Sequence, residues 1–173
     1  MPGSIGFTYN FIVMKTRLLG LIFIILPVLF LSSCEDSILT EQSASVDPLG
    51  WKIDDTVGFS YLVKDSLIPV DFILTARNES NYPYSNMFIF MDTRFPDGRM
   101  IRDTLELTLA STDGKWLGEG FGSLKYSSFL VKHNVLFPMN GTYRFIMKHG
   151  MRDEALKGIH DIGIKIQKTN TDN

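Results

Sequence analysis

The stretch Val70–Arg77, which reads VDFILTAR, decides the fold class, because apolar and polar side chains alternate along it with a period of two. Successive side chains of an extended strand point to opposite faces, so this alternation is typical of a strand with one buried face. The apolar set is Val70, Phe72, Leu74 and Ala76, and the polar set is Asp71, Thr75 and Arg77. We therefore expect a β-strand with the first set facing a core.

The same alternation recurs along most of the chain. The further apolar rows run from Phe59 to Val63, Leu105 to Leu109, Phe129 to Phe137, Tyr143 to Met147 and Ile162 to Ile166. The run Met87–Met91 is apolar at every position, which predicts a central strand. Turn signals such as Pro96-Asp97-Gly98 separate the rows. We predict an all-β fold, an antiparallel β-sandwich resembling a jelly roll, as a single domain over residues 50–173.

Two segments lie outside the strand pattern. The polar run Thr40–Ser45 predicts a flexible tether over residues 34–49. Met151–Lys157, followed by Gly158, is typical of a short helix with a glycine at its carboxyl end.

The amino-terminal segment has the organisation of a secretory signal. Lys15 and Arg17 precede an apolar region that is too short to span a bilayer comfortably. The segment ends in LSSC, a lipobox, in which Cys34 receives acyl chains such as palmitate and becomes the first residue after cleavage of the signal peptide, 14–33. Residues 1–13 fit no signal and predict a mis-assigned start, with translation beginning at Met14. An uncleaved anchor helix is the alternative, and both readings tether the domain to a membrane.

Charge and cysteine content exclude several classes of function. Loss of Lys15 and Arg17 leaves 15 cationic against 19 acidic residues, a net charge of −4. Nucleic-acid binders and polybasic membrane-surface modules need an excess of cations, so we expect neither. The single cysteine excludes an intrachain disulfide and any multi-cysteine metal site. We expect no cofactor other than the covalent lipid on Cys34.

Residues that could carry catalysis are scattered along the chain. The three histidines, His133, His149 and His160, lack the close spacing of a zinc protease motif. His133 shares the parity of Phe129 and Val131, which predicts a partly buried, hydrogen-bonded side chain.

Four carboxylates invite comparison with a glycoside hydrolase, which needs two such groups flanking the scissile bond. They are Asp92, Asp97, Asp103 and Asp113. Acidic residues at strand ends and turns are common, however, so we predict no catalytic residue, no metal site and no enzyme activity.

Aromatic residues outside the alternating rows are the candidates for an interaction surface, and they are Trp51, Tyr82, Tyr84 and Trp116. Such rings stack on sugars or anchor protein interfaces. The two tryptophans could equally close the ends of the core, and the sequence leaves both interpretations open. The glycine-rich stretch Gly114–Gly122 lacks the strand-to-helix setting of a phosphate loop, so we expect its aromatic residues to plug the sandwich.

Several motifs in a fixed order make the mature chain resemble the gliding-motility lipoprotein GldH family of the Bacteroidetes. They lie in Tyr82–Asn86, Phe95–Leu105, Gly114–Gly122, Phe137–Tyr143 and Met151–Ile159. The resemblance implies an outer-membrane lipoprotein that is needed for gliding and is associated with the type IX secretion apparatus. It assigns no catalytic residue, so only Cys34 is carried over.

We therefore expect a non-catalytic accessory or structural component of the envelope, lipid-anchored at the periplasmic face or the cell surface, that binds other envelope proteins. The alternative is a surface glycan-binding lipoprotein. A planar row of exposed aromatic rings would favour the alternative.

Overall fold

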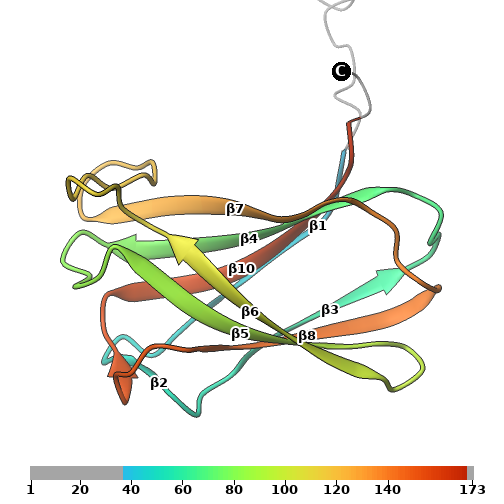
Figure 1. Cartoon of the computed structure of the whole chain (residues 1–173), viewed down its shortest axis with the longest axis horizontal. Coiled ribbons are helices and arrows are strands. Elements are labelled where there is room, and N and C mark those ends of the chain that lie inside the picture. The colour runs from blue at the N-terminus through green and yellow to red at the C-terminus, as the bar shows by residue number, and fades with distance from the viewer. Residues whose placement is uncertain (1–36, 171–173) are drawn as a thin grey trace, which may run out of the picture. The chain divides into compact units, whose positions relative to one another are not determined.

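The computed structural model describes residues 37–170, which contain ten strands and no helix (Figure 1). The strands are β1 (Ile38–Ser45), β2 (Trp51–Lys52), β3 (Val57–Val63), β4 (Val70–Glu79), β5 (Asn86–Arg94), β6 (Met100–Thr108), β7 (Leu124–Val135), β8 (Gly141–His149), β9 (Ala155–Leu156) and β10 (Ile159–Lys168). Within this range no helix has the length and apolar character needed to cross a bilayer.

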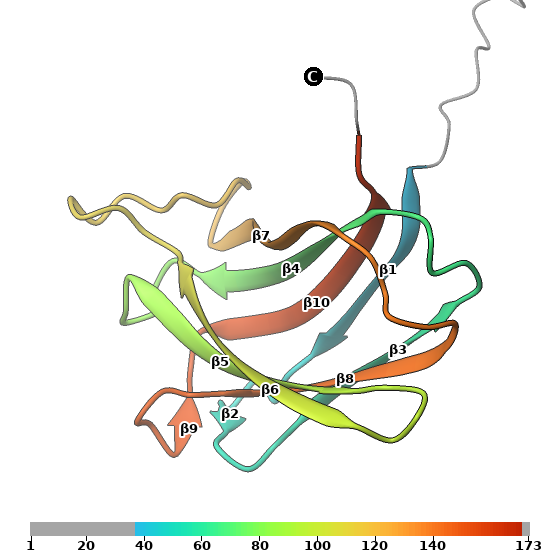
Figure 2. The same ribbon diagram turned by 45° about the vertical axis from the view of Figure 1, so that its right-hand side comes forward.

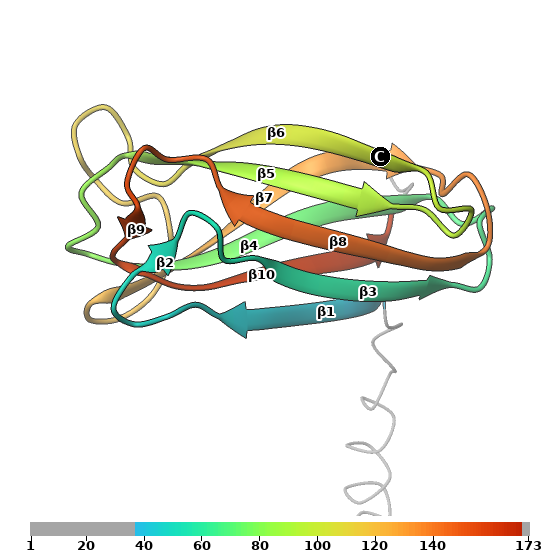
Figure 3. The same ribbon diagram turned by 90° about the horizontal axis from the view of Figure 1, so that it is seen from below.

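The eight longer strands form two antiparallel sheets that face each other (Figure 2). One sheet has the order β1-β10-β4-β7, and the other has the order β3-β8-β5-β6, whose strands run side by side in Figure 3. Among these eight strands, every connection crosses from one sheet to the other except the β5–β6 hairpin. This is the order of a jelly roll, so the predicted β-sandwich is confirmed.

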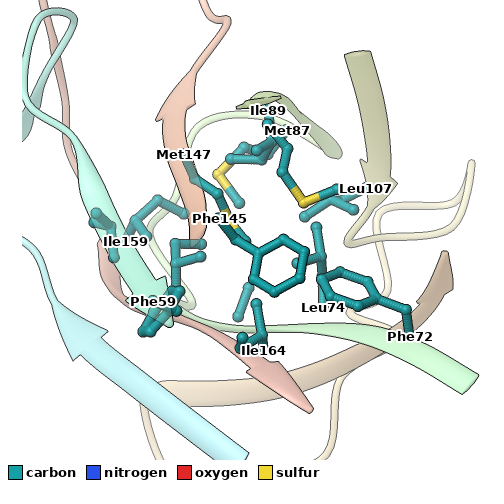
Figure 4. Packing of buried hydrophobic residues seen from close by; sticks show 14 of the residues in the cluster. Phe59, Phe72, Leu74, Met87, Ile89, Leu107, Phe145, Met147, Ile159 and Ile164 are labelled. Carbon is teal, nitrogen blue, oxygen red and sulfur yellow. The ribbon is translucent and has the colours of Figure 1, made fainter. Parts of the chain in front are cut away.

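The core lies between the two sheets and is built from the predicted apolar rows (Figure 4). Phe72 of β4 and Phe145 of β8 meet across the sandwich, with ring centroids 4.9 Å apart. β5 lies between β8 and β6, which confirms the central strand predicted from Met87–Met91. Its inward residues are buried, whereas Phe88 and Phe90 are half-buried on the outer face.

The predicted flexible tether is wrong over residues 38–45, which form the edge strand β1. β1 pairs with β10 from Ile38 opposite Gln167 to Ser45 opposite Asp161. Because β1 is an edge strand whose only apolar contacts with the core are made by Leu39 and Ala44, its apolar pattern is too sparse to be recognised. Ladder pairing, rather than hydrophobic burial, holds this strand in place.

The predicted helix at Met151–Lys157 is also wrong. The segment is a loop that contains β9, which pairs with β2 through Trp51 opposite Leu156. Both of these side chains are buried, so burial against Trp51 overrides the weak local helix preference. Gly158 has a positive φ of 82°, as a helix-ending glycine would, but here it lets the backbone approach Tyr82.

β4 is buried on both faces, whereas the sequence predicted a solvated polar face. Asp71 and Thr75 are buried because β4 is an inner strand of its sheet. The Asp71 carboxylate accepts hydrogen bonds from the backbone N–H of Asn134 at 3.0 Å and from the Thr169 hydroxyl at 2.8 Å, and it lies 2.8 Å from Nδ1 of His133. Burial raises the pKa of Asp71, but these bonds outweigh it and hold the pKa below its usual value.

The sandwich has two ends that carry different loops. We call the end where β1 begins the proximal end; its loops are 64–69, 95–99 and 136–140. The distal end is where β1 finishes, and its loops are 46–56, 80–85, 109–123 and 150–158. The two sets of loops lie at opposite sides of the sandwich in Figure 1.

Candidate interaction surfaces

The predicted lipidation site, Cys34, and the predicted signal peptide lie outside the described residues. The described part begins close to that site, since β1 starts at Ile38. The lipidation of Cys34 therefore stays a prediction. The candidate sites described below lie on the surface of the sandwich.

Two of the four predicted surface aromatics belong to the core instead. Trp51 is buried, its Nε1 donates a hydrogen bond to the Asp55 carbonyl at 3.0 Å, and its ring meets the His149 ring edge-on. Tyr82 is buried as well, and its hydroxyl donates to the Asn86 carbonyl at 3.0 Å. Burial raises the pKa of Tyr82 well above its usual value. Neither ring is available to a partner while the domain stays folded.

The other two aromatics are accessible to different degrees. Tyr84 is exposed, packs edge-on against Tyr82, and donates a hydrogen bond from its hydroxyl to Asp153 at 2.8 Å. That hydrogen bond raises the pKa of Tyr84. Trp116 is half-buried against the core, as expected for a ring that plugs the sandwich.

Tyr84 and Trp116 sit on neighbouring distal loops. The Ser85 carbonyl accepts hydrogen bonds from the backbone N–H groups of Leu109 and Ala110 at 2.8 and 2.9 Å. Ala110 in turn forms an isolated bridge with Trp116. The fold therefore brings loops 80–85 and 109–123 together at one end.

Two apolar residues on loop 109–123 are exposed, and the expectation that the aromatic residues of Gly114–Gly122 plug the sandwich is wrong for one of them, Phe121. Leu117 is 57% exposed and Phe121 is fully exposed. They lie among glycines, and Gly120 and Gly122 have positive φ values of 139° and 76°. Because these two residues lie between glycines, they do not follow the alternation of a strand. Their position in a glycine-rich loop is the feature of the sequence that could have identified them as exposed. We name Tyr84, Trp116, Leu117 and Phe121 the distal patch.

The three histidines lie apart and have different environments. His149 is fully buried, and burial lowers its pKa. His160 lies 3.0 Å from the buried carboxylate of Asp161. His133 is hydrogen-bonded as predicted, but it is exposed rather than partly buried, because bulges in the β4–β7 pairing break the parity of β7. Within residues 37–170 no group of three or more His, Cys, Asp or Glu side chains could hold a metal ion.

The four carboxylates considered for hydrolysis do not converge. The register places Asp92 on the outer face of its sheet, while Asp103 on β6 is directed inward, and the other two lie in turns at opposite ends. Each carboxylate has its own partner; the pairs are Asp92 with Arg102, Asp97 with Arg99, Asp103 with Lys132 and Asp113 with Ser111. The Arg102 guanidinium, bound at 2.6 Å, holds the pKa of Asp92 below its usual value. A carboxyl held ionised in this way is unsuited to act as a general acid.

An apolar cavity of about 260 Å³ opens between the sheets at the proximal end. Its lining includes Val70, Phe72, Phe95, Ile101, Leu136 and Phe137. A more polar hollow of about 670 Å³ lies at the distal end, beside Leu49, Glu79, Lys157 and His160.

Comparisons with solved structures give only low similarity. A carbohydrate-binding module specific for non-crystalline cellulose aligns with a TM-score of 0.40 and 7% identity, over 76% of this chain and 75% of that one. A mitogen from Yersinia pseudotuberculosis aligns with a TM-score of 0.36 and 6% identity, over 80% and 90% of the two chains.

Comparisons of sequence are far stronger. The gliding motility lipoprotein GldH homolog of Christiangramia forsetii is 34% identical, over 90% of this chain and 99% of that protein. The gliding motility lipoprotein GldH of Flavobacterium johnsoniae is 32% identical, over 84% and 94% of the two chains. The family described as GldH lipoprotein matches residues 38–166, which run from the first residue of β1 into β10. The chain therefore belongs to the GldH lipoprotein family.

Proposed function

We propose that this protein is a non-catalytic accessory component of the gliding or type IX secretion machinery, held at the outer membrane by acyl chains on Cys34, and that it binds another envelope protein through its distal patch. Membership of a gliding-motility lipoprotein family supports the cellular role. The observation that carries the binding role is the exposed apolar surface of loop 109–123.

The distal patch has the character of a protein interface. Aromatic residues are enriched in interface cores, and contiguous exposed apolar surface is uncommon on a monomer that has no partner. Leu117 and Phe121 are exposed apolar residues of the same loop, and Trp116, which precedes Leu117 in the sequence, packs against the core. In protein interfaces, a few aromatic residues contribute most of the binding energy, and the contacts around them exclude water.

The position of the patch suits a tethered adaptor. Cys34 precedes Ile38 by four residues, so an acylated chain enters the sandwich at its proximal end. β1 then runs eight residues toward the distal end, which at about 3.4 Å per residue is roughly 27 Å. A partner would therefore meet the patch on the side facing away from the anchor.

Capture of partners from crosslinked native envelopes tests the proposal. The tagged full chain should recover a defined set of envelope proteins, and Leu117→Ser combined with Phe121→Ala should reduce that recovery at least about tenfold, because roughly 1.4 kcal/mol of lost interface contact corresponds to that factor. The matched control is Leu130→Ser, because Leu130 is 58% exposed against 57% for Leu117 but lies on β7. Equal recovery by the double variant and the wild type would overturn the role of the patch.

Two further measurements separate the anchor from the binding role. Metabolic labelling with palmitate should mark the wild type, and Cys34→Ala should abolish both the label and sedimentation with membranes. In a gliding host that lacks the gene, the wild type should restore colony spreading and the distal double variant should not.

Glycan binding receives less support from the geometry. It would require a planar row of exposed rings, and Trp51 and Tyr82 are buried. A response on a glycan array that is lost in the Tyr84→Ala and Trp116→Ala variants would revive that alternative.

A further inference from the structure

Contacts at the proximal end of the sandwich link its three loops to one another and to the carboxyl end of β10. The backbone N–H of Ser66 donates to Oδ1 of Asn140 at 2.8 Å, which connects loop 64–69 to loop 136–140. The backbone N–H of Thr169 donates to the Pro69 carbonyl at 3.0 Å. Gly141 lies so close to Pro96 that an added Cβ would come within 2.7 Å of the proline ring. These contacts fix the loops relative to one another.

Large apolar side chains are exposed on two of the proximal loops and at the proximal ends of three strands. They are Ile38, Leu62, Leu67, Met100, Ile101 and Leu136, which we name the proximal patch. Leu67 stands out because it is 80% exposed at the tip of its loop. Ile101 and Leu136 also line the apolar cavity, so the exposed surface continues into the sandwich.

Cations border the proximal patch in an arrangement that costs stability. Arg94 on β5 stands directly opposite Arg144 on β8, and Met100 is the neighbour of Arg94 on β6. Like charges directly opposite each other in a sheet are destabilising. Neither arginine has an ion-pair partner among residues 37–170. An anionic group placed over the two arginines would relieve the repulsion.

The distribution of charge differs between the two ends. The proximal loops are neutral overall, because Lys64 and Arg99 balance Asp65 and Asp97, and the two arginines add positive charge beside them. The distal loops carry four cationic and seven acidic side chains, a net charge of −3. The proximal loops are therefore less acidic than the distal loops, and Arg94 and Arg144 lie beside them, while Glu35 and Asp36 precede β1 in the sequence.

We propose that the proximal patch docks onto the lipid surface itself, with Leu67 and Leu136 entering the headgroup boundary and Arg94 and Arg144 binding lipid phosphates. The proposal rests on the proposed function in one respect, the acylation of Cys34. Three residues lie between Cys34 and Ile38, so the Cα atom of Ile38 cannot lie more than about 14 Å from that of the acylated residue. At that distance the effective concentration of the patch at the bilayer is high, so weak contacts suffice.

Depth measurement on the acylated full chain tests this docking. Acylation blocks the thiol of Cys34, so a single introduced cysteine can be labelled selectively with bimane. Leu67→Cys and Leu136→Cys probe the proximal patch. Their matched controls at the distal end are Leu49→Cys and Leu117→Cys, because Leu49 is 83% exposed against 80% for Leu67, and Leu117 is 57% exposed against 55% for Leu136.

The labelled proteins are reconstituted into vesicles of phosphatidylethanolamine and phosphatidylglycerol that contain nitroxide-labelled lipids. We expect the nitroxides to quench bimane at positions 67 and 136 several-fold more than at positions 49 and 117. Arg94→Gln combined with Arg144→Gln, or 0.5 M salt, should reduce the contrast, because phosphate contacts are screened.

Three results would overturn the docking. Equal quenching at both ends would show that the proximal patch stays in water. Protection of position 67 in native envelopes but not in vesicles would assign the patch to a protein. If the chain did not float with vesicles, both the lipid anchor and the docking would be refuted. The docking does not depend on the distal patch, so loss of partner capture by the distal variants would leave it unchanged.

Discussion

Acidification should destabilise this domain through His149, a fully buried histidine that ends β8. Neither ring nitrogen has a hydrogen-bond partner within residues 37–170, and the ring lies edge-on to Trp51 with centroids 5.4 Å apart. Burial therefore lowers the pKa of His149 from its usual value of 6.5, and the nearby charge of Asp153 opposes this only in part. At a pH just below 6.5, the His149 ring is therefore mostly neutral in the folded domain and mostly protonated in the unfolded chain.

The sign and size of the effect follow from proton linkage. A histidine whose pKa is depressed by folding leaves stability unaffected above the unfolded-state value of 6.5 and reduces it as the pH falls below that value. One differential proton changes the free energy of unfolding by at most about 1.4 kcal/mol per pH unit. Between pH 7.5 and 5.5 we therefore expect a loss of up to about 1.4 kcal/mol, reached if the folded ring stays neutral throughout.

Urea unfolding of the detergent-solubilised protein at pH 7.5, 6.5 and 5.5, followed by tryptophan fluorescence, measures the effect. His149→Phe removes the titrating ring and should abolish most of the loss. His160→Gln is the control and should retain it, because His160 is exposed and stands at the other end of the β8–β10 connection. If His149→Phe and the wild type lost stability equally on acidification, the assignment to His149 would be refuted.

Three further predictions address the fold. Gly163→Ala should destabilise the domain by about 1–3 kcal/mol, because the added Cβ would lie 2.5 Å from Oγ1 of Thr75. Gly58→Ala is the control and should change stability by less than about 0.5 kcal/mol, because no atom lies within 4 Å of its added Cβ. The urea midpoints of the two variants measure the difference. Asp71→Asn should cost about 1–3 kcal/mol at pH 7, and chemical denaturation should show the difference shrinking as the pH falls through the lowered pKa of Asp71, because that contribution exists only while the carboxylate is ionised. Deletion of residues 38–45 should reduce the free energy of unfolding by several kcal/mol at about 1 kcal/mol per ladder hydrogen bond, and hydrogen exchange should show β10 losing protection; a flexible tether could be deleted without either change.

The sequence predicted the sandwich where local pattern and burial agree. The apolar rows that contain Leu74, Ile89 and Ile164 were recognised as strands from their local pattern, and the structure buries all three residues in the core. Prediction failed at β1 and at residues 151–157, where pairing with a distant strand decides the conformation. Local propensity carries no information about such a partner.

The candidate surfaces were less predictable than the fold. Trp51 and Tyr82 could not be placed from the sequence, because a large aromatic ring suits a core and an interface equally well. The fold buried these two and exposed Tyr84, Leu117 and Phe121 instead. Exposure depends on what the rest of the chain leaves uncovered, which is a property of the packed domain.

By itself the sequence determined the family, the all-β class and the identity of the single thiol that could carry lipid, because motif order, periodicity and residue type are local properties. The tertiary structure was needed to show that the neutral loops lie together at one end, beside Arg94 and Arg144, and the acidic loops at the other. The positions of charged and exposed apolar residues in space depend on the fold, because the jelly roll brings together loops that are far apart in the sequence, such as those joined by Ser66 and Asn140 and by Ile53 and Glu154.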